Sequence, residues 1–317
     1  LKRRMEATFI FLMALFFALA ARLTWIQGVQ HAHFEKLAES IHRRTLRLFA
    51  ARGLIVDRHN QEIVSNVEAK TLFANPRAVP DKPAAAQKIA EILRGSPDDY
   101  LAKLNHDTLK TGKPNCFVYL ARAADRDRVD RIMALKIPGL EAQAEPKRVH
   151  PSSSLAAHVT GFADIEGVGR EGTERTENRV LQGKDGEIQQ EGDAIGRPIP
   201  DTVLLYRPPV NGGTVKLTID SNIQAFAEAE LRKIQENFAP EGSTVIVMDV
   251  RTGQILALAN APSFDPNHPG TGPAQYRRDR AIQDLYEPGS TFKGVTISAA
   301  LEEHLPDTTV FCTGSKQ

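Results

Sequence analysis

The sequence feature that most constrains the fold is a long apolar segment near the N-terminus. Residues 7–26 are predominantly apolar and follow Lys2, Arg3 and Arg4. A helix of about 20 such residues crosses about 30 Å of hydrocarbon, and flanking basic residues stay on the cytoplasmic side. The segment therefore predicts either a membrane anchor or a cleaved signal peptide. Both interpretations place the rest of the chain outside the cytoplasm.

Length, charge and cysteine content limit what the rest of the chain can be. The 317 residues predict about two domains of roughly 150 residues each. The 40 Lys and Arg residues balance the 39 Asp and Glu residues, so the chain lacks the basic excess of a typical nucleic-acid-binding protein. Cys116 and Cys312 have neither a CxxC nor a Cys/His spacing. Their spacing argues against a zinc site and a disulfide framework.

The first half alternates short strands with helices. Residues 51–66 predict a β-hairpin around the polar turn 57–61. A helix is expected at 81–95, with Pro83 in its first turn and Gly95 as its cap. Further strands are expected at 71–76 and 117–122, and further helices at 28–47 and 125–135. This alternation predicts a mixed α/β domain.

The second half begins with loops and then changes character. Residues 161–200 are rich in glycine but contain no nucleotide-binding fingerprint, and 207–215 is expected to connect two domains. Residues 221–238 predict an amphipathic helix that starts with a capping box, Ser221 and Gln224. Two apolar strands then predict a hairpin around Gly253.

The stretch YEPGSTFK, residues 286–293, places a serine and a lysine at helical spacing. A helix is expected from about Ser290 to His304, and residues three apart share one of its faces, so Lys293 reaches the Ser290 hydroxyl. A serine needs such a base to act as a nucleophile, and the N–H of Ser290 could face a developing oxyanion. An N-cap serine beside an exposed lysine gives the same pattern, so the context has to decide.

Several segments together resemble the monofunctional class B penicillin-binding proteins, the D,D-transpeptidases of bacterial peptidoglycan synthesis. The likeness covers nearly the whole chain and includes ARGLIVDRHNQEIVSN, GTERTENRVLQGKDG, VKLTID, VIVMDVRTGQILALANAPSFDPN and RAIQDLYEPGSTFK. Ser-x-x-Lys is a nucleophile motif of penicillin-binding proteins. The resemblance favours an uncleaved anchor over a signal peptide.

The resemblance implies an α+β protein of several domains in the inner (cytoplasmic) membrane. Residues 1–6 would be cytoplasmic, 7–26 the anchor, 27–210 a mixed α/β pedestal or dimerisation domain, and 211–317 the first part of a transpeptidase domain. That domain, similar to the serine β-lactamases, would have an α/β sheet with helices on both faces. The pedestal would meet cell-wall synthase partners such as a glycosyltransferase.

The resemblance also implies a mechanism. Ser290 would attack the D-Ala-D-Ala amide of a stem peptide and release D-Ala, with Lys293 as general base and the Ser290 N–H as oxyanion donor. The acyl group would then pass to an acceptor amine of a neighbouring strand. Penicillin and other β-lactams would acylate Ser290. No metal or organic cofactor is expected.

The chain departs from the family after Ser290. The family has a Ser-x-Asn and a Lys-[Ser/Thr]-Gly motif there, but this chain has no Ser-x-Asn, and its Lys-Thr-Gly at 110–112 precedes Ser290. We expect 110–112 to be a turn, the chain to hold a truncated catalytic domain that is inactive alone, and its hairpin and last helix to expose apolar faces. A non-catalytic cell-wall scaffold, if the chain ends naturally at 317, and a β-lactam sensor are the alternatives.

Overall fold

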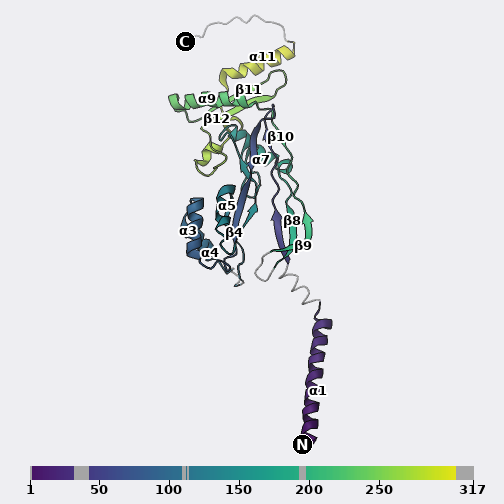
Figure 1. The fold of residues 1–317 in the computed structure, drawn as a ribbon. Coiled ribbons are helices and arrows are strands. Elements are labelled where there is room, and N and C mark those ends of the chain that lie inside the picture. Colours follow the sequence, from purple (N-terminus) through teal and green to yellow (C-terminus); the bar gives the residue numbers. More distant parts are fainter. Residues whose placement is uncertain (1, 32–42, 109–111, 113, 193–197, 305–317) are drawn as a thin grey trace, which may run out of the picture.

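The N-terminal element is a long helix apart from all others. The computed structural model describes residues 2–31, 43–108, 112, 114–192 and 198–304. Helix α1 (Lys2–Thr24) continues into a π-helical turn, η1 (Trp25–Val29), and its large apolar side chains are exposed (Figure 1). In the described part of the chain, this is the one helix long and apolar enough to cross a membrane. The expected apolar helix is present, and the span itself stays a prediction.

The described residues from 43 to 210, which we call the pedestal, have their largest core around a three-stranded antiparallel sheet. Its strands lie in the order β5 (Val118–Asp125), β4 (Ala69–Ala74), β6 (Leu140–Ala144), with helices α3 (Lys82–Leu93), α4 (Pro97–Leu104) and α5 (Arg126–Ala134) packed against them. Pro83 lies in the first turn of α3, as predicted, and Asp81 is its N-cap, but the left-handed C-cap is Arg94 rather than Gly95. The prediction missed α4, because its eight residues bury only Tyr100 and Leu104.

A second sheet joins distant parts of the chain. Its order is β10 (Val215–Lys216), β2 (Ile55–Val56), β3 (Glu62–Val67), β7 (Lys147–Val149), and the short helices α6 (Ala157–Thr160), α7 (Gly172–Thr176) and α8 (Asn178–Leu181) lie along the chain between β7 and β10. Strands β2 and β3 form the predicted hairpin. Strand β10 runs parallel to β2, so the chain returns to the pedestal after the connecting segment. The backbone before β2 and the backbone before β10 lie so close together that Gly53 is required, since a Cβ there would lie 1.8 Å from the carbonyl oxygen of Gly213.

The third sheet corrects one prediction. It is antiparallel, in the order β1 (Arg43–Leu48), β8 (Gly186–Gly192), β9 (Pro198–Arg207). The helix expected at 28–47 is therefore wrong for residues 43–47, and residues 32–42 lie outside the described chain. Leu46 lies opposite Ile188 in the register. A partner strand so distant in sequence decides the structure of β1, because strand formation depends on cross-strand packing more than on local preference.

Beyond the pedestal, a helix packs on one face of a hairpin. Helix α9 (Ser221–Phe238) lies against β11 (Ser243–Met248) and β12 (Ile255–Ala261), and Ala227 and Leu231 are buried there. Both elements match the prediction. The capping box does not, because the N-cap is Asp220, whose carboxylate accepts from the N–H groups of Asn222 and Ile223.

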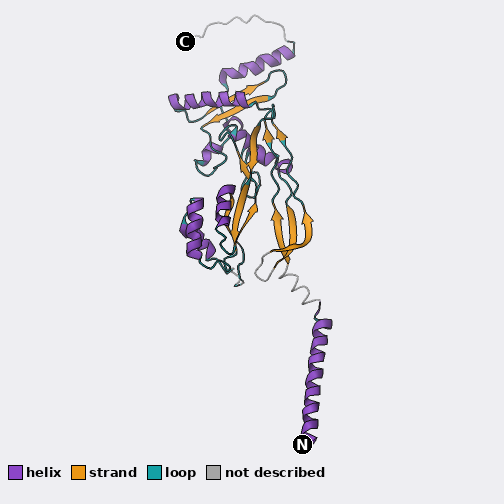
Figure 2. Cartoon of the chain, in the orientation of Figure 1, coloured by secondary structure: helices purple, strands orange, loops and turns teal. Residues whose placement is uncertain are grey.

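The opposite face of this hairpin is largely open along β11. Ile246 and Met248 alternate with the inward-facing residues of β11 and are each 52% exposed. A sheet with helices on both faces was expected; in the described chain α9 covers one face, and on the other only the segment at α10 (Arg280–Gln283) packs on the strands, beside Asn260. The chain continues through η2 (Ala274–Arg277), α10, η3 (Gly289–Phe292) and α11 (Lys293–Glu302), with α11 at the end of the molecule far from α1 (Figure 2).

Candidate active site

Ser290 and Lys293 lie one helical turn apart. Ser290 is in the 3₁₀ turn η3, Lys293 begins α11, and the N–H of Lys293 donates to the carbonyl oxygen of Ser290. In such a turn, side chains at i and i+3 lie on the same face. Gly289, with a left-handed φ of 54°, precedes the serine at a position that favours glycine. The structure thus gives the predicted spacing, although the α-helix begins three residues later than expected.

Within the described chain, the side chains of Ser290 and Lys293 make no contacts that would occupy their polar groups. Ser290 and Lys293 are exposed, and neither side chain has a hydrogen-bond or ion-pair partner among the described residues. The N–H of Ser290 is in the first turn of η3, where a helix supplies no acceptor of its own. A hydroxyl, an amine and a free N–H are the groups needed for acyl transfer.

The turn η3 and helix α11 show an apolar surface. Phe292, Val295, Ile297 and Leu301 are 56–68% exposed, and no residue of α11 is buried. Together with Ile246 and Met248, they confirm the expectation that the hairpin and the last helix expose apolar faces.

A buried asparagine links the hairpin to the segment that leads to Ser290. The Oδ1 atom of Asn260 accepts from the Thr244 hydroxyl at 2.9 Å and from the N–H of Ala281 at 3.1 Å. Its Nδ2 donates to Asp279 at 2.8 Å. Asn260 therefore fixes the start of α10 on the sheet. Its role was not predictable, because a polar residue in an apolar strand shows its partners only in the fold.

Polar contacts also fasten the unit beyond the pedestal to the pedestal itself. The side chain of Asn267 accepts from the N–H of His150 at 2.9 Å and donates to the carbonyl of His150 at 3.0 Å. The N–H of Ala156 donates to Glu228 at 2.8 Å, and Arg277 pairs with Glu171 at 3.2 Å. These bonds set where the unit that bears Ser290 sits.

Inside the pedestal, two arginines share one carboxylate. Glu174 is 0% exposed, and its two oxygens accept from the Nε atoms of Arg52 at 2.5 Å and Arg148 at 2.7 Å. Arg52 also donates to the carbonyls of Gly167 and Glu174 and to the side chain of Asn178. This cluster joins β7, α7 and the segment before β2. Sequence periodicity gave no signal for it, since all three residues are charged.

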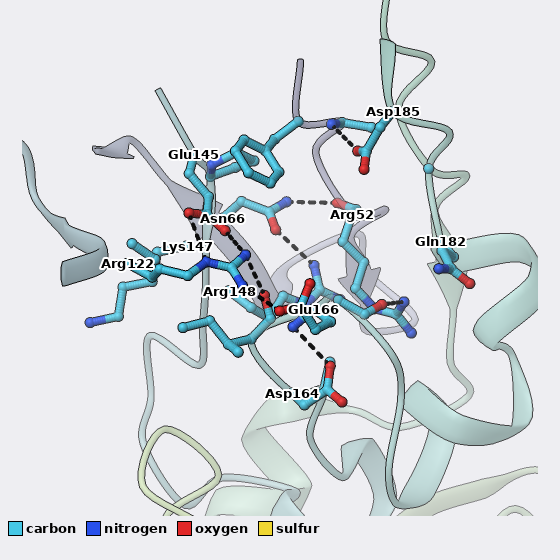
Figure 3. Close-up of a pocket in the computed structure, with 18 of the residues that line it drawn as sticks. Arg52, Asn66, Arg122, Glu145, Lys147, Arg148, Asp164, Glu166, Gln182 and Asp185 are labelled. Carbon is cyan, nitrogen blue, oxygen red and sulfur yellow. Dashed lines mark hydrogen bonds and ion pairs between the residues drawn. The ribbon is translucent and has the colours of Figure 1, made fainter. Parts of the chain in front are cut away.

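A cavity of about 350 Å³ opens beside this cluster, between the sheets that contain β1 and β4. Figure 3 shows the Arg122 guanidinium between Glu145 and Glu166, and Asn66 bridging the backbone of Arg52 to the Arg148 side chain. Hydrogen bonding to Glu145 and Glu166 raises the pKa of Arg122, against the effect of burial. Ser290 and Lys293 do not line this cavity.

The other sequence candidates add no further site. Cys312 and most of the Lys-Thr-Gly stretch at 110–112 lie outside the described residues; only Gly112 is described, and it has a left-handed φ of 74°. Within the described ranges, no group of three or more His, Cys, Asp or Glu side chains could hold a metal ion.

The fold defines a two-part protein, in which an α/β pedestal carries a second unit that bears the serine–lysine turn. Residues 47–217 match the family described as Penicillin-binding Protein dimerisation domain, and 243–317 match Penicillin binding protein transpeptidase domain. The chain belongs to the penicillin-binding proteins, and its relatives place it among the class B enzymes.

Named relatives agree with this assignment. The chain is 34% identical over 303 residues to the probable peptidoglycan D,D-transpeptidase PenA of Neisseria meningitidis, covering 94% of this chain and 51% of that protein. It is 33% identical to the peptidoglycan D,D-transpeptidase FtsI of Escherichia coli, covering 92% of this chain and 49% of FtsI. The chain thus spans about half the length of these curated relatives.

A solved structure supports the fold. The crystal structure of a peptidoglycan synthetase from Bifidobacterium adolescentis superposes with a TM-score of 0.55 at 25% identity, over 84% of this chain and 52% of that one. The expected mixed α/β architecture of a penicillin-binding protein is therefore confirmed.

Proposed function

We propose that the chain belongs to a D,D-transpeptidase that cross-links peptidoglycan through an acyl-enzyme on Ser290. The observation that carries the proposal is the turn that places Ser290 and Lys293 on one face with free side chains. Transpeptidase relatives at 33–34% identity supply the substrate class.

In this mechanism, Ser290 Oγ attacks the carbonyl of the penultimate D-Ala while Lys293 takes the hydroxyl proton. The N–H of Ser290 donates to the oxyanion. The terminal D-Ala leaves as an amine after protonation, and an acceptor amine then attacks the acyl-serine and restores the hydroxyl. A β-lactam follows the first step and remains on Ser290.

The division of the chain completes the proposal. Residues 1–6 lie in the cytoplasm, 7–26 cross the inner membrane once, 27–210 form the pedestal, and 211–317 belong to the transpeptidase domain. The exposed apolar surface of α1 behind basic residues supports the anchor. The pedestal, held to the second unit by Asn267 and Glu228, supplies the surface for a glycosyltransferase partner.

Acylation by a labelled penicillin, mapped by mass spectrometry on the product of the whole gene, tests the proposal. We expect the label on Ser290, none in Ser290→Ala, and a rate lowered about 100- to 10,000-fold in Lys293→Ala. Ser298→Ala, on the same helix, serves as control and should label normally. A label that persists in Ser290→Ala would refute the assignment, and a folded protein that takes no label would favour the scaffold alternative.

A further inference from the structure

Arg280, the first residue of α10, fastens the segment that leads to Ser290 to the loop before β11. Its guanidinium lies directly against the backbone of Gly242, where a Cβ would lie 2.5 Å from Nε of Arg280. Its Nη2 donates to the carbonyl oxygen of Glu241 at 3.2 Å, and its Nη1 donates to Asp284 at 2.9 Å. Since the side chain is only 19% exposed, these contacts are partly shielded from solvent. Arg280 therefore connects both ends of α10 to this loop.

The carboxylate of Asp284, the C-cap of α10, is shared by two arginines. Its Oδ2 pairs with Arg280 at 2.9 Å, and its Oδ1 pairs with Nε of Arg278 at 2.6 Å. Oδ1 is buried and accepts no hydrogen bond from the described residues, so the ion pair compensates its charge. Arg278 otherwise donates to the carbonyl oxygen of Gln283 at 3.2 Å, within the same segment. Of the two ion pairs, the one with Arg280 is thus the link to the hairpin.

Between Asp284 and Ser290 the described chain shows no further attachment of this kind. Leu285 and Tyr286 are 100% and 80% exposed, and residues 287–289 are exposed as well. Side chains of 285–289 form no hydrogen bond or ion pair with the described residues, and the carbonyl of Pro288 accepts from Thr291 within the turn itself. Pro288 restricts its own φ and the conformation of the residue before it. The direction in which the chain leaves Asp284 therefore carries over to Ser290.

We propose that Asp284 and Arg280 are positioning residues for the serine nucleophile, because their ion pair against the loop before β11 sets the course of the chain to Ser290. The inference rests on the proposed acyl transfer and adds to it two residues that form no bond to Ser290 or Lys293. A misplacement of about 1 Å that originates far from the chemistry can cost about 100-fold in rate. Loss of this ion pair should therefore slow acylation more than it weakens the binding that precedes it.

Acylation of the product of the whole gene by a labelled penicillin, followed at several penicillin concentrations, separates the first-order acylation constant from non-covalent binding. We expect Asp284→Asn and Arg280→Ala each to lower the first-order constant about 10- to 100-fold and to leave non-covalent binding unchanged. The double variant should be no slower than the slower single variant, because the two residues act as one unit. Arg278→Ala should lose less, since its ion pair does not reach the hairpin.

Glu230→Gln is the matched control. It breaks an exposed ion pair with Lys233 on α9, so it should acylate as the parent does.

Hydrogen exchange tests the same inference without depending on acylation. The amides of 282–284 and of Thr291 are hydrogen-bonded, and their exchange should quicken in Asp284→Asn while that of β11 and β12 stays as it was. If the parent takes no label on Ser290, the proposed function is refuted and hydrogen exchange alone decides the role of Asp284. Unchanged exchange at these amides, additive losses in the double variant, or weakened binding with an unaltered acylation constant would each overturn the inference.

Discussion

At the scale of single residues, the pedestal contains polar groups that local sequence could not reveal. His150 is 5% exposed, and its Nδ1 atom has no partner among the described residues. Burial, and to a lesser extent the charge of Arg148, lower the pKa of His150 to about 4, against the raising effect of Asp265. The imidazole is therefore held neutral beside the bonds that Asn267 makes to its backbone.

We predict that His150 makes the pedestal sensitive to acid. Its folded pKa of about 4 lies below the unfolded value of 6.5, so between these values the unfolded chain binds the proton and the folded one does not. The stability is at its full value above pH 6.5 and falls as the pH drops through the range between the two pKa values; the loss amounts to roughly 3 kcal/mol at pH 4.

Urea unfolding near neutral pH and near pH 4 measures this effect. His150→Asn should remove most of the pH-dependent loss in the free energy of unfolding, whereas the exposed His106→Asn should leave it unchanged. An unaltered pH dependence in His150→Asn would show that the histidine is not responsible.

At the scale of elements, helices and strands whose apolar pattern lies within one segment were predicted. Elements that form only by pairing with a distant segment were not. Helix α9 and the hairpin of β11 and β12 carry their own apolar periodicity and turn glycine, so their bounds were predictable. Strand β1 carries only a short alternation, Leu46 and Leu48 around Arg47, and depends on β8. The turn of Ser290 and Lys293 is local and was predicted, whereas Asn260 and the Arg52–Glu174–Arg148 cluster depend on tertiary contacts.

We predict that Asp220, not Ser221, starts α9. Its carboxylate accepts from two backbone N–H groups, so Asp220→Ala should lower the free energy of unfolding by about 1 kcal/mol. Asp220→Asn keeps the cap and should lose much less. Thermal or urea unfolding of these variants beside Asn222→Ala, an exposed neighbour, makes the comparison. Equal losses in Asp220→Asn and Asp220→Ala would assign the effect to the contact with His59 instead.

At the scale of the whole molecule, a few side chains fix the second unit on the pedestal. Asn267 holds both backbone groups of His150 in the way that a paired strand would. Glu228 and Arg277 add contacts at other points of the same joint. These bonds therefore set the orientation of the Ser290 unit. The sequence pattern of neither unit predicts them.

We predict that Asn267→Ala loosens this joint without unfolding either unit. Two lost hydrogen bonds to buried backbone groups should cost about 1–3 kcal/mol. Hydrogen exchange of the amides around His150 should quicken, while that of the β4 and β12 strands stays as it was. Ser263→Ala, an exposed residue of the same loop, is the control. Unchanged exchange at His150 would mean that other contacts hold the joint.

The register of β1 against β8 has a consequence for biogenesis. Leu48 lies opposite Gly186, so the first strand of the pedestal can pair only after another 138 residues have been synthesised. At about 5–20 residues per second, synthesis imposes a delay of roughly 7–28 seconds. During that time β1 remains an unpaired strand. Closure of its sheet, which joins the most distant segments of the pedestal, is then the step expected to limit the rate of maturation, since such contacts form slowly.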